Sequence, residues 1–150
     1  MESSGSTRVL IVAHKTAATP ALLDAVRERA GRGPCRFTLL VPNVTHGLHR
    51  VVDPEDQTAT ETEAVLELAL PLLEEVAGGP VEGRVGDAEP LAAVQDALNL
   101  DGYDEVILST LPARVSRWLR LDLPRKVAAL GVPVTTVTAR SSGEPGNRTA

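Results

Sequence analysis

Arg8-Val-Leu-Ile-Val-Ala13 is a short, continuous run of apolar and mostly β-branched residues. Such a run is typical of a β-strand buried on both faces, as in a parallel sheet covered by helices. It is followed by residues 21–30, whose apolar side chains recur at helical spacing. Pro20 suits the first turn of that helix and Gly31 suits its end. A buried strand followed directly by a helix predicts the first half of a βαβ unit.

The same alternation continues along the chain. Further strands are predicted at 36–41, 81–85, 104–109 and 132–138, and further helices from Thr60, from Pro90 and from Pro124. The strand at 81–85 alternates apolar and polar residues, which favours a place near an edge of the sheet. The order predicts an α/β fold, a three-layer αβα sandwich around a five-stranded, mainly parallel sheet. Ligands of such sheets lie beyond the carboxyl ends of the strands, which here means 13–20, 42–50, 86–90 and 109–123.

Local signals set the predicted helix ends. Thr60 precedes Glu63 by three residues, the spacing of a capping box, and residues 44–57 before it look irregular. The apolar stripe of this helix consists of Val65, Leu68, Leu72 and Val76. Asp87 is the predicted cap of the helix that begins at Pro90. Residues 110–122 are predicted to be a long basic connection.

The composition is that of one globular domain. The chain has 150 residues, of which 43% are hydrophobic and 23% charged, while aromatic residues make up only 2%. We therefore expect a single domain at 8–139, with a core of aliphatic side chains, and disordered tails at 1–7 and 140–150, which are rich in small and polar residues.

The net charge of −5 argues against general binding to nucleic acid or to anionic membranes. No apolar run approaches the roughly 20 residues that span a bilayer. The single cysteine, Cys35, excludes an internal disulfide and suits a reducing compartment. We expect a soluble, cytoplasmic protein.

The chain resembles the universal stress protein family, within the adenine-nucleotide α-hydrolase-like fold group, over roughly residues 8–139. The element order carries the resemblance together with four stretches of sequence. These are Arg8-Val-Leu-Ile-Val-Ala13, Glu82-Gly-Arg-Val-Gly-Asp87 leading into Pro90, Tyr103-Asp-Glu-Val-Ile-Leu-Ser109, and Val132-Pro-Val-Thr-Thr-Val137. The resemblance implies a Rossmann-like module of the stress response, homodimeric, with a possible ligand among ATP, ADP and AMP.

The ATP-binding members carry Gly-x2-Gly-x9-Gly-[Ser/Thr] after the fourth strand, where glycine backbone amides approach the phosphates. The four fixed positions of that motif fall here on Ser109, Pro112, Asp122 and Leu123, none of which is the expected residue. Pro112 has no N–H to donate, and Asp122 places a carboxylate where a phosphate would lie. The family also often has an Asp at the end of strand one, where this chain has His14. The sequence therefore describes a divergent member without the glycine-rich ATP motif.

Two segments at carboxyl ends of strands carry the candidate ligand residues. They are His14, Lys15 and Thr16 after the first strand, and Ser109, Thr110, Arg114, Ser116 and Arg117 after the fourth. Arginine forks and hydroxyls can bind phosphate or carboxylate without a glycine cradle. The alternative is a solvated basic face that pairs with the eight Asp or Glu residues of 53–75, a segment with no Lys or Arg.

The remaining candidate residues are an aromatic side chain, two histidines and the cysteine, and they give weaker indications of a functional site. Trp118 either stacks on an adenine or packs against a neighbouring strand or a second subunit. His46 and His49 do not form a metal motif, because no cysteine or carboxylate cluster accompanies them, and no metal is predicted. Cys35 is expected to be half buried and to have no functional role. No catalytic motif is visible, so no enzyme is predicted.

Two functions remain open at this point. The first is a non-enzymatic regulatory module of the universal stress protein type that has lost the standard ATP site. The second is a module that binds a nucleotide or another anion through the Arg-rich loop 109–123 and the strand-one loop 13–16. In either case Val134, Thr136 and Val137 are the predicted seam of a homodimer, since the last strand would be a free edge.

Overall fold

The computed structural model describes residues 7–43, 54–112 and 116–139, and within 54–60 it describes the backbone alone. The predicted tails therefore lie outside the described residues, except for Thr7, which begins the first strand. Arg114, His46 and His49 also lie outside them.

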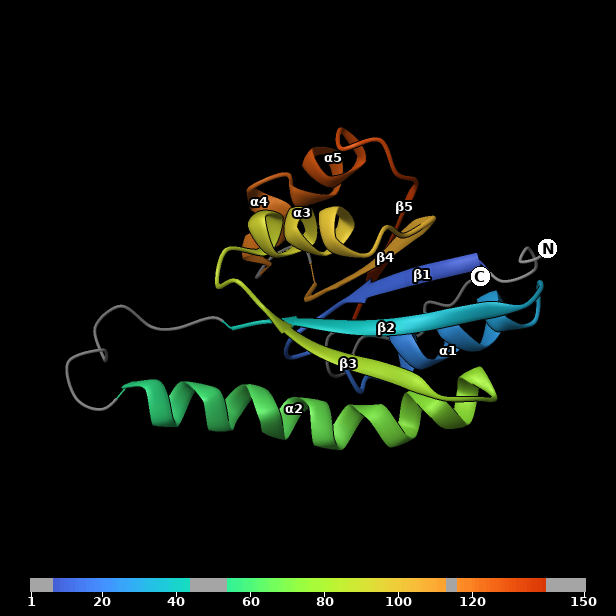
Figure 1. Ribbon diagram of the computed structural model, residues 1–150, viewed down its shortest axis with the longest axis horizontal. Coiled ribbons are helices and arrows are strands. Elements are labelled where there is room, and N and C mark those ends of the chain that lie inside the picture. The colour runs from blue at the N-terminus through green and yellow to red at the C-terminus, as the bar shows by residue number, and fades with distance from the viewer. Residues whose placement is uncertain (1–6, 44–53, 113–115, 140–150) are drawn as a thin grey trace.

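The fold is a parallel five-stranded sheet between two layers of helices (Figure 1). The strands are β1 (Thr7–Val12), β2 (Cys35–Pro42), β3 (Val81–Gly86), β4 (Glu105–Thr110) and β5 (Val134–Thr138). The helices are α1 (Pro20–Ala30), α2 (Pro54–Ala77), α3 (Pro90–Leu100), α4 (Arg117–Arg120) and α5 (Leu123–Ala128). The strand order is β3-β2-β1-β4-β5, and every pairing is parallel. The predicted α/β sandwich is confirmed, and so is the place of β3 at an edge.

The two faces of β1 belong to two different cores. Val9, Ile11 and Ala13 face α1 and α2, together with Leu22 and Leu73. The intervening residues of β1 face α3 and α5 in the second core, which contains Leu10, Val12, Val94, Leu108 and Val127. Burial on both faces explains why β1 is a continuous apolar run rather than an alternating one.

The ends of α1 and α3 follow the predicted signals, with Pro20 and Pro90 in their first turns. The predicted cap of α3 is wrong, because the N-cap residue is Glu89. The Asp87 Oδ1 atom instead accepts a hydrogen bond of 2.9 Å from the Glu89 backbone N–H. Asp87 thus shapes the turn before the helix rather than the helix end itself.

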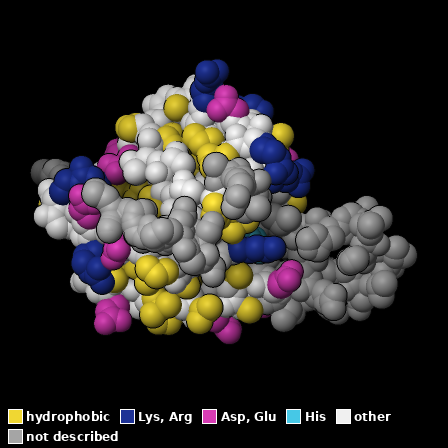
Figure 2. Space-filling model, turned by 180° about the vertical axis from the view of Figure 1, so that it is seen from behind, with side chains coloured by type: hydrophobic (Ala, Val, Ile, Leu, Met, Phe, Trp, Pro, Cys, Tyr) yellow, Lys and Arg dark blue, Asp and Glu magenta, His cyan; other side chains and the backbone are white. Residues whose placement is uncertain are grey.

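Helix α2 differs from the prediction in its start and in its buried face. It begins at Pro54, six residues before the capping-box pattern at Thr60. Val65 and Val76 of the predicted stripe pack against the first core. Leu68 is 64% exposed and Leu72 is 37% exposed, whereas the neighbouring Ala69 and Leu73 are fully buried. Apolar side chains consequently gather at the surface along the lower edge of the molecule, where α2 lies (Figure 2).

The predicted connection at 110–122 contains a further short helix, α4. The N-cap of α4 is Ser116, whose hydroxyl oxygen accepts a hydrogen bond of 3.1 Å from the Leu119 N–H. Asp122 then precedes α5 in a left-handed conformation with φ of 60°.

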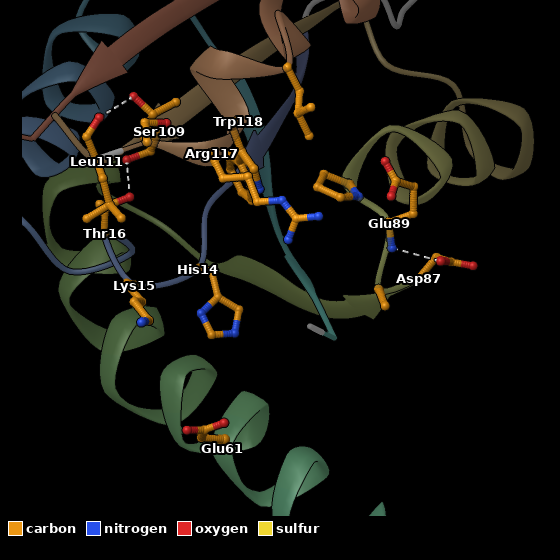
Figure 3. A pocket seen from close by; sticks show the side chains of 15 residues that line it. His14, Lys15, Thr16, Glu61, Asp87, Glu89, Ser109, Leu111, Arg117 and Trp118 are labelled. Atoms are coloured by element: carbon orange, nitrogen blue, oxygen red, sulfur yellow. Dashed lines mark hydrogen bonds between the residues drawn. The ribbon is translucent and has the colours of Figure 1, made fainter. Parts of the chain in front are cut away.

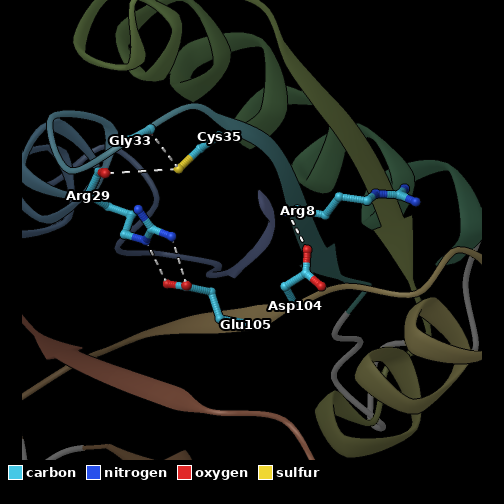
Figure 4. Close-up of polar contacts among 6 residues, drawn as sticks. All are labelled: Arg8, Arg29, Gly33, Cys35, Asp104 and Glu105. Atoms are coloured by element: carbon cyan, nitrogen blue, oxygen red, sulfur yellow. Dashed lines mark hydrogen bonds and ion pairs between the residues drawn. The ribbon is translucent and has the colours of Figure 1, made fainter. Parts of the chain in front are cut away.

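Polar contacts fasten the amino ends of the strands (Figure 4). The Arg29 guanidinium at the end of α1 donates two hydrogen bonds to the Glu105 carboxylate at the start of β4, at 3.0 and 3.1 Å. The Arg8 backbone N–H donates to the Asp104 carboxylate at 2.8 Å. Cys35 is half buried beside Arg29, and burial raises the pKa of its thiol. These contacts leave the opposite end of the sheet for the candidate site.

Candidate functional site

A cavity of about 500 Å³ lies beyond the carboxyl ends of β1, β3 and β4 (Figure 3). This size is in the range of small-molecule sites. Its lining comes from the loops after these strands, from α2 and from α4. The lining residues are His14, Lys15, Thr16, Glu61, Asp87, Ala88, Glu89, Pro90, Ser109, Thr110, Leu111, Ser116, Arg117, Trp118 and Leu121.

The structure brings together the two segments that the sequence singled out. Seven of the eight candidate ligand residues line the cavity, and the eighth, Arg114, is outside the described residues. The two loops meet because β1 and β4 are hydrogen-bonded neighbours in the sheet. Whether these residues bind a ligand stays a prediction.

A buried pair of hydroxyls joins the two loops. The Thr16 Oγ1 and Ser109 Oγ atoms lie 2.6 Å apart, with the residues only 3% and 2% exposed. One hydroxyl donates to the other, so the hydrogen of the second hydroxyl remains able to donate elsewhere. The Thr110 hydroxyl donates instead to the Leu111 carbonyl oxygen at 3.0 Å.

Helix α4 presents one cation and one aromatic ring to the cavity. The Ser116 hydroxyl oxygen caps the helix by accepting the hydrogen bond from the Leu119 N–H, so it has a structural role. Arg117 is exposed, and its side chain extends into the cavity in front of Trp118 (Figure 3). Trp118 also packs against the second core, which confirms the packing interpretation. The stacking interpretation remains open, because the same residue lines the cavity.

The charges of the cavity differ from those that an anion site needs. Lys15 and Arg117 are accompanied by three carboxylates, those of Glu61, Asp87 and Glu89. Asp87 and Glu89 lie in a loop that the topology marked as a place to search, whereas Glu61 comes from α2. No sequence signal could place Glu61 here, since its contact with the cavity depends on how α2 packs on the sheet.

His14 is held toward its neutral form. Burial lowers the pKa of its imidazole below the ordinary value of 6.5, the Glu61 carboxylate opposes this shift, and the Lys15 ammonium adds to it. Because burial is the largest cause, the imidazole is mostly neutral near pH 7. A neutral ring adds no positive charge to the cavity.

The acids of α2 do not pair with the basic segment among the described side chains. The ion pairs among the described residues are Arg27–Asp24, Arg29–Glu105, Arg84–Asp101 and Arg125–Asp122. Within the same part of the chain, no group of three His, Cys, Asp or Glu residues is placed to hold a metal ion.

No family model matches the sequence, and no curated protein matches it. The structure nevertheless resembles solved structures over most of its length. Universal stress protein UspA from Lactobacillus plantarum has a TM-score of 0.62 at 15% identity, over 89% of this chain and 97% of that one. The chain has the universal stress protein fold.

Two further structures carry nucleotides. The universal stress protein from Archaeoglobus fulgidus in complex with dAMP has a TM-score of 0.59 at 17% identity, covering 88% of this chain and 97% of that one. A universal stress protein family protein from Arabidopsis thaliana with AMP bound has a TM-score of 0.57 at 12% identity, covering 90% and 93%. The resemblance inferred from the sequence is confirmed at the level of the fold, and the low identity fits a divergent chain.

In the described part of the chain, no helix combines the length and the apolar character needed to cross a bilayer.

Proposed function

We propose that this protein is a non-enzymatic regulatory module of the universal stress protein type that has lost the standard ATP site. Its fold supports the general assignment. We further propose that it works in the cytoplasm as a homodimer joined through β5.

One observation carries the loss of the ATP site. At the positions that the glycine motif would occupy, Asp122 is the residue before α5, and Leu123 is only 4% exposed in the second core. A carboxylate at that position repels phosphate, and a core leucine offers it no hydroxyl. Pro112 lacks the backbone donor that a glycine would supply.

The hydroxyls around the cavity support a non-enzymatic role. The Thr16 and Ser109 hydroxyls bond to each other, and the Thr110 hydroxyl donates to a backbone carbonyl. Ser116 accepts the hydrogen bond that caps α4. A nucleophilic hydroxyl needs a neighbouring base within hydrogen-bond reach, and among the described residues none of these four hydroxyls bonds to a basic side chain.

Native mass spectrometry of the gently purified protein, followed by thermal-shift titration with ATP, ADP and AMP, tests the proposal. We expect no retained nucleotide, no shift and no ATP turnover above background. A ligand at a hundred times its dissociation constant adds about 2.7 kcal/mol to stability, so a retained site would be visible. A clear shift with ATP would overturn the proposed loss, and ATP turnover would overturn the non-enzymatic role.

The alternative is a site for a nucleotide or another anion, and the gathering of the two predicted segments around one cavity favours it. Lys15 and Arg117 would then hold the anion. Lys15→Ala and Arg117→Ala should each abolish binding of a ligand seen with the wild type. Arg120→Ala is the matched control, because Arg120 lies on the same short helix and does not line the cavity.

A further inference from the structure

The carboxylates of the cavity lie on two sides of it. Glu61 belongs to α2, on the side of His14 and Lys15, whereas Asp87 and Glu89 belong to the loop between β3 and α3 (Figure 3). Together with Lys15 and Arg117 they give the lining one more negative than positive side chain.

Asp87 and Glu89 are available to a ligand. Both residues are exposed, and neither forms an ion pair with a described lysine or arginine. The Asp87 Oδ1 atom accepts a hydrogen bond from the backbone N–H of Glu89. An ionised carboxylate accepts hydrogen bonds and donates none, so its ligand partner must offer O–H or N–H groups.

The rest of the lining suits a small organic molecule. The Thr16–Ser109 pair leaves one hydroxyl hydrogen for an acceptor on the ligand, and Trp118 offers a ring face. A polyphosphate would instead bring several negative charges toward the exposed carboxylates of Asp87 and Glu89, which repel it.

We propose that the cavity binds a neutral or positively charged small molecule with hydroxyl or amine groups, and that Asp87 and Glu89 exclude polyphosphates from it. This inference rests on the proposed function, since it assigns a ligand class to the same module after the loss of its ATP site. Asp87 and Glu89 act as specificity-determining residues.

Three probes that share adenine and ribose and differ at the 5′ position test the charge preference. They are 5′-amino-5′-deoxyadenosine, which is cationic, adenosine, which is neutral, and ATP. Isothermal titration of the full chain should show affinity falling in that order, with ATP at least tenfold weaker than adenosine.

The double variant Asp87→Asn, Glu89→Gln tests the assignment to these two residues. Both replacements keep an acceptor oxygen and remove the charge, so ATP should bind at least tenfold more tightly than to the wild type and the amine more weakly. Glu82→Gln with Asp96→Asn removes the same charge from exposed residues that do not line the cavity. This control should leave all three affinities unchanged, and thermal melting checks that each variant folds.

The outcomes separate this inference from the proposed function. Tighter binding of ATP than of adenosine to the wild type would overturn both. Binding of none of the three probes would overturn the inference and leave the loss of the ATP site standing. If the wild type shows the expected order of affinities but the double variant has the same affinities as the wild type, the role of Asp87 and Glu89 would be overturned.

Discussion

His14 connects the protonation of the cavity to the stability of the fold. Burial lowers the pKa of the folded-state imidazole, while the unfolded chain takes up its proton near the ordinary value of 6.5. As the pH falls through 6.5, the unfolded chain is therefore protonated at His14 before the folded protein is. The unfolding free energy decreases over this range, until the pH falls below the lowered pKa of the folded state.

Replacing His14 by glutamine should remove this dependence. Between about pH 7.5 and pH 5, the unfolding free energy of His14→Gln should fall less than that of the wild type, because only the wild type has this imidazole to protonate. Urea unfolding at a series of pH values measures the difference. Curves for the two proteins that stay parallel through this range would contradict the lowered pKa.

The Arg29–Glu105 pair should contribute more stability than an ordinary surface ion pair. Its side chains are 14% and 22% exposed and share two hydrogen bonds. Glu105→Gln should lower the unfolding free energy by about 1–2 kcal/mol, since a charge-assisted bond is lost at a largely buried site. The matched control is Asp24→Asn, which breaks an Arg27 pair whose side chains are 61% and 74% exposed and should cost under about 0.5 kcal/mol. Equal losses of unfolding free energy for the two variants in chemical denaturation would show that burial does not strengthen the Arg29–Glu105 pair.

At the scale of the elements, Gly86 sets how closely α3 approaches the end of β3. A Cβ atom at this position would lie 2.8 Å from the Ala93 Cβ atom and 2.8 Å from the Leu40 Cδ1 atom. Gly86→Ala should therefore lower the unfolding free energy by about 1–3 kcal/mol, because α3 would have to move away from the sheet. Gly79→Ala is the control, since a Cβ atom there meets nothing within 4 Å. Chemical denaturation of both variants checks the prediction, and an unchanged Gly86→Ala midpoint would contradict the close approach.

Helix α2 shows where sequence patterns mislead. The capping box at Thr60 lies inside the helix, and Pro54 at its true first position carries the start signal that was missed. The stripe through Leu68 and Leu72 has helical spacing, yet the sheet and α1 bury the neighbouring stripe through Ala69 and Leu73. Periodicity identifies a helix, whereas the face that becomes buried depends on its neighbours in three dimensions.

For the whole molecule, the sequence sufficed for the sheet and for most of the cavity. Parallel βαβ connections place the loops after all strands at one edge, so 13–20, 86–90 and 109–123 are all predicted places for a ligand, but the predicted ligand residues come only from 14–16 and 109–117. Nothing in the sequence singled out Asp87 and Glu89 within their loop, and Glu61 could not be placed at all, since α2 reaches the cavity only through its packing. Without Glu61, Asp87 and Glu89, the cavity would have been described as basic, although its lining carries more carboxylates than ammonium and guanidinium groups.

The edge position of β5 makes the predicted dimer testable at the level of the backbone. β5 pairs with β4 on one side and with no other described strand. The Pro133 carbonyl and the Ala139 N–H both bond to β4. Successive residues of a strand direct their backbone groups to opposite sides, so the N–H groups of Val134 and Thr136 point away from β4.

Proline at either position should therefore be tolerated by the sheet and should remove a donor from the free edge. We expect the wild type to be a dimer and Val134→Pro and Thr136→Pro to be monomers, by native mass spectrometry and light scattering. Thr135→Pro is the contrasting variant, because it removes a donor directed at β4 and should lower the melting temperature. A dimer that persists in both edge variants would exclude backbone pairing through the free edge of β5 and would contradict the predicted seam of Val134, Thr136 and Val137.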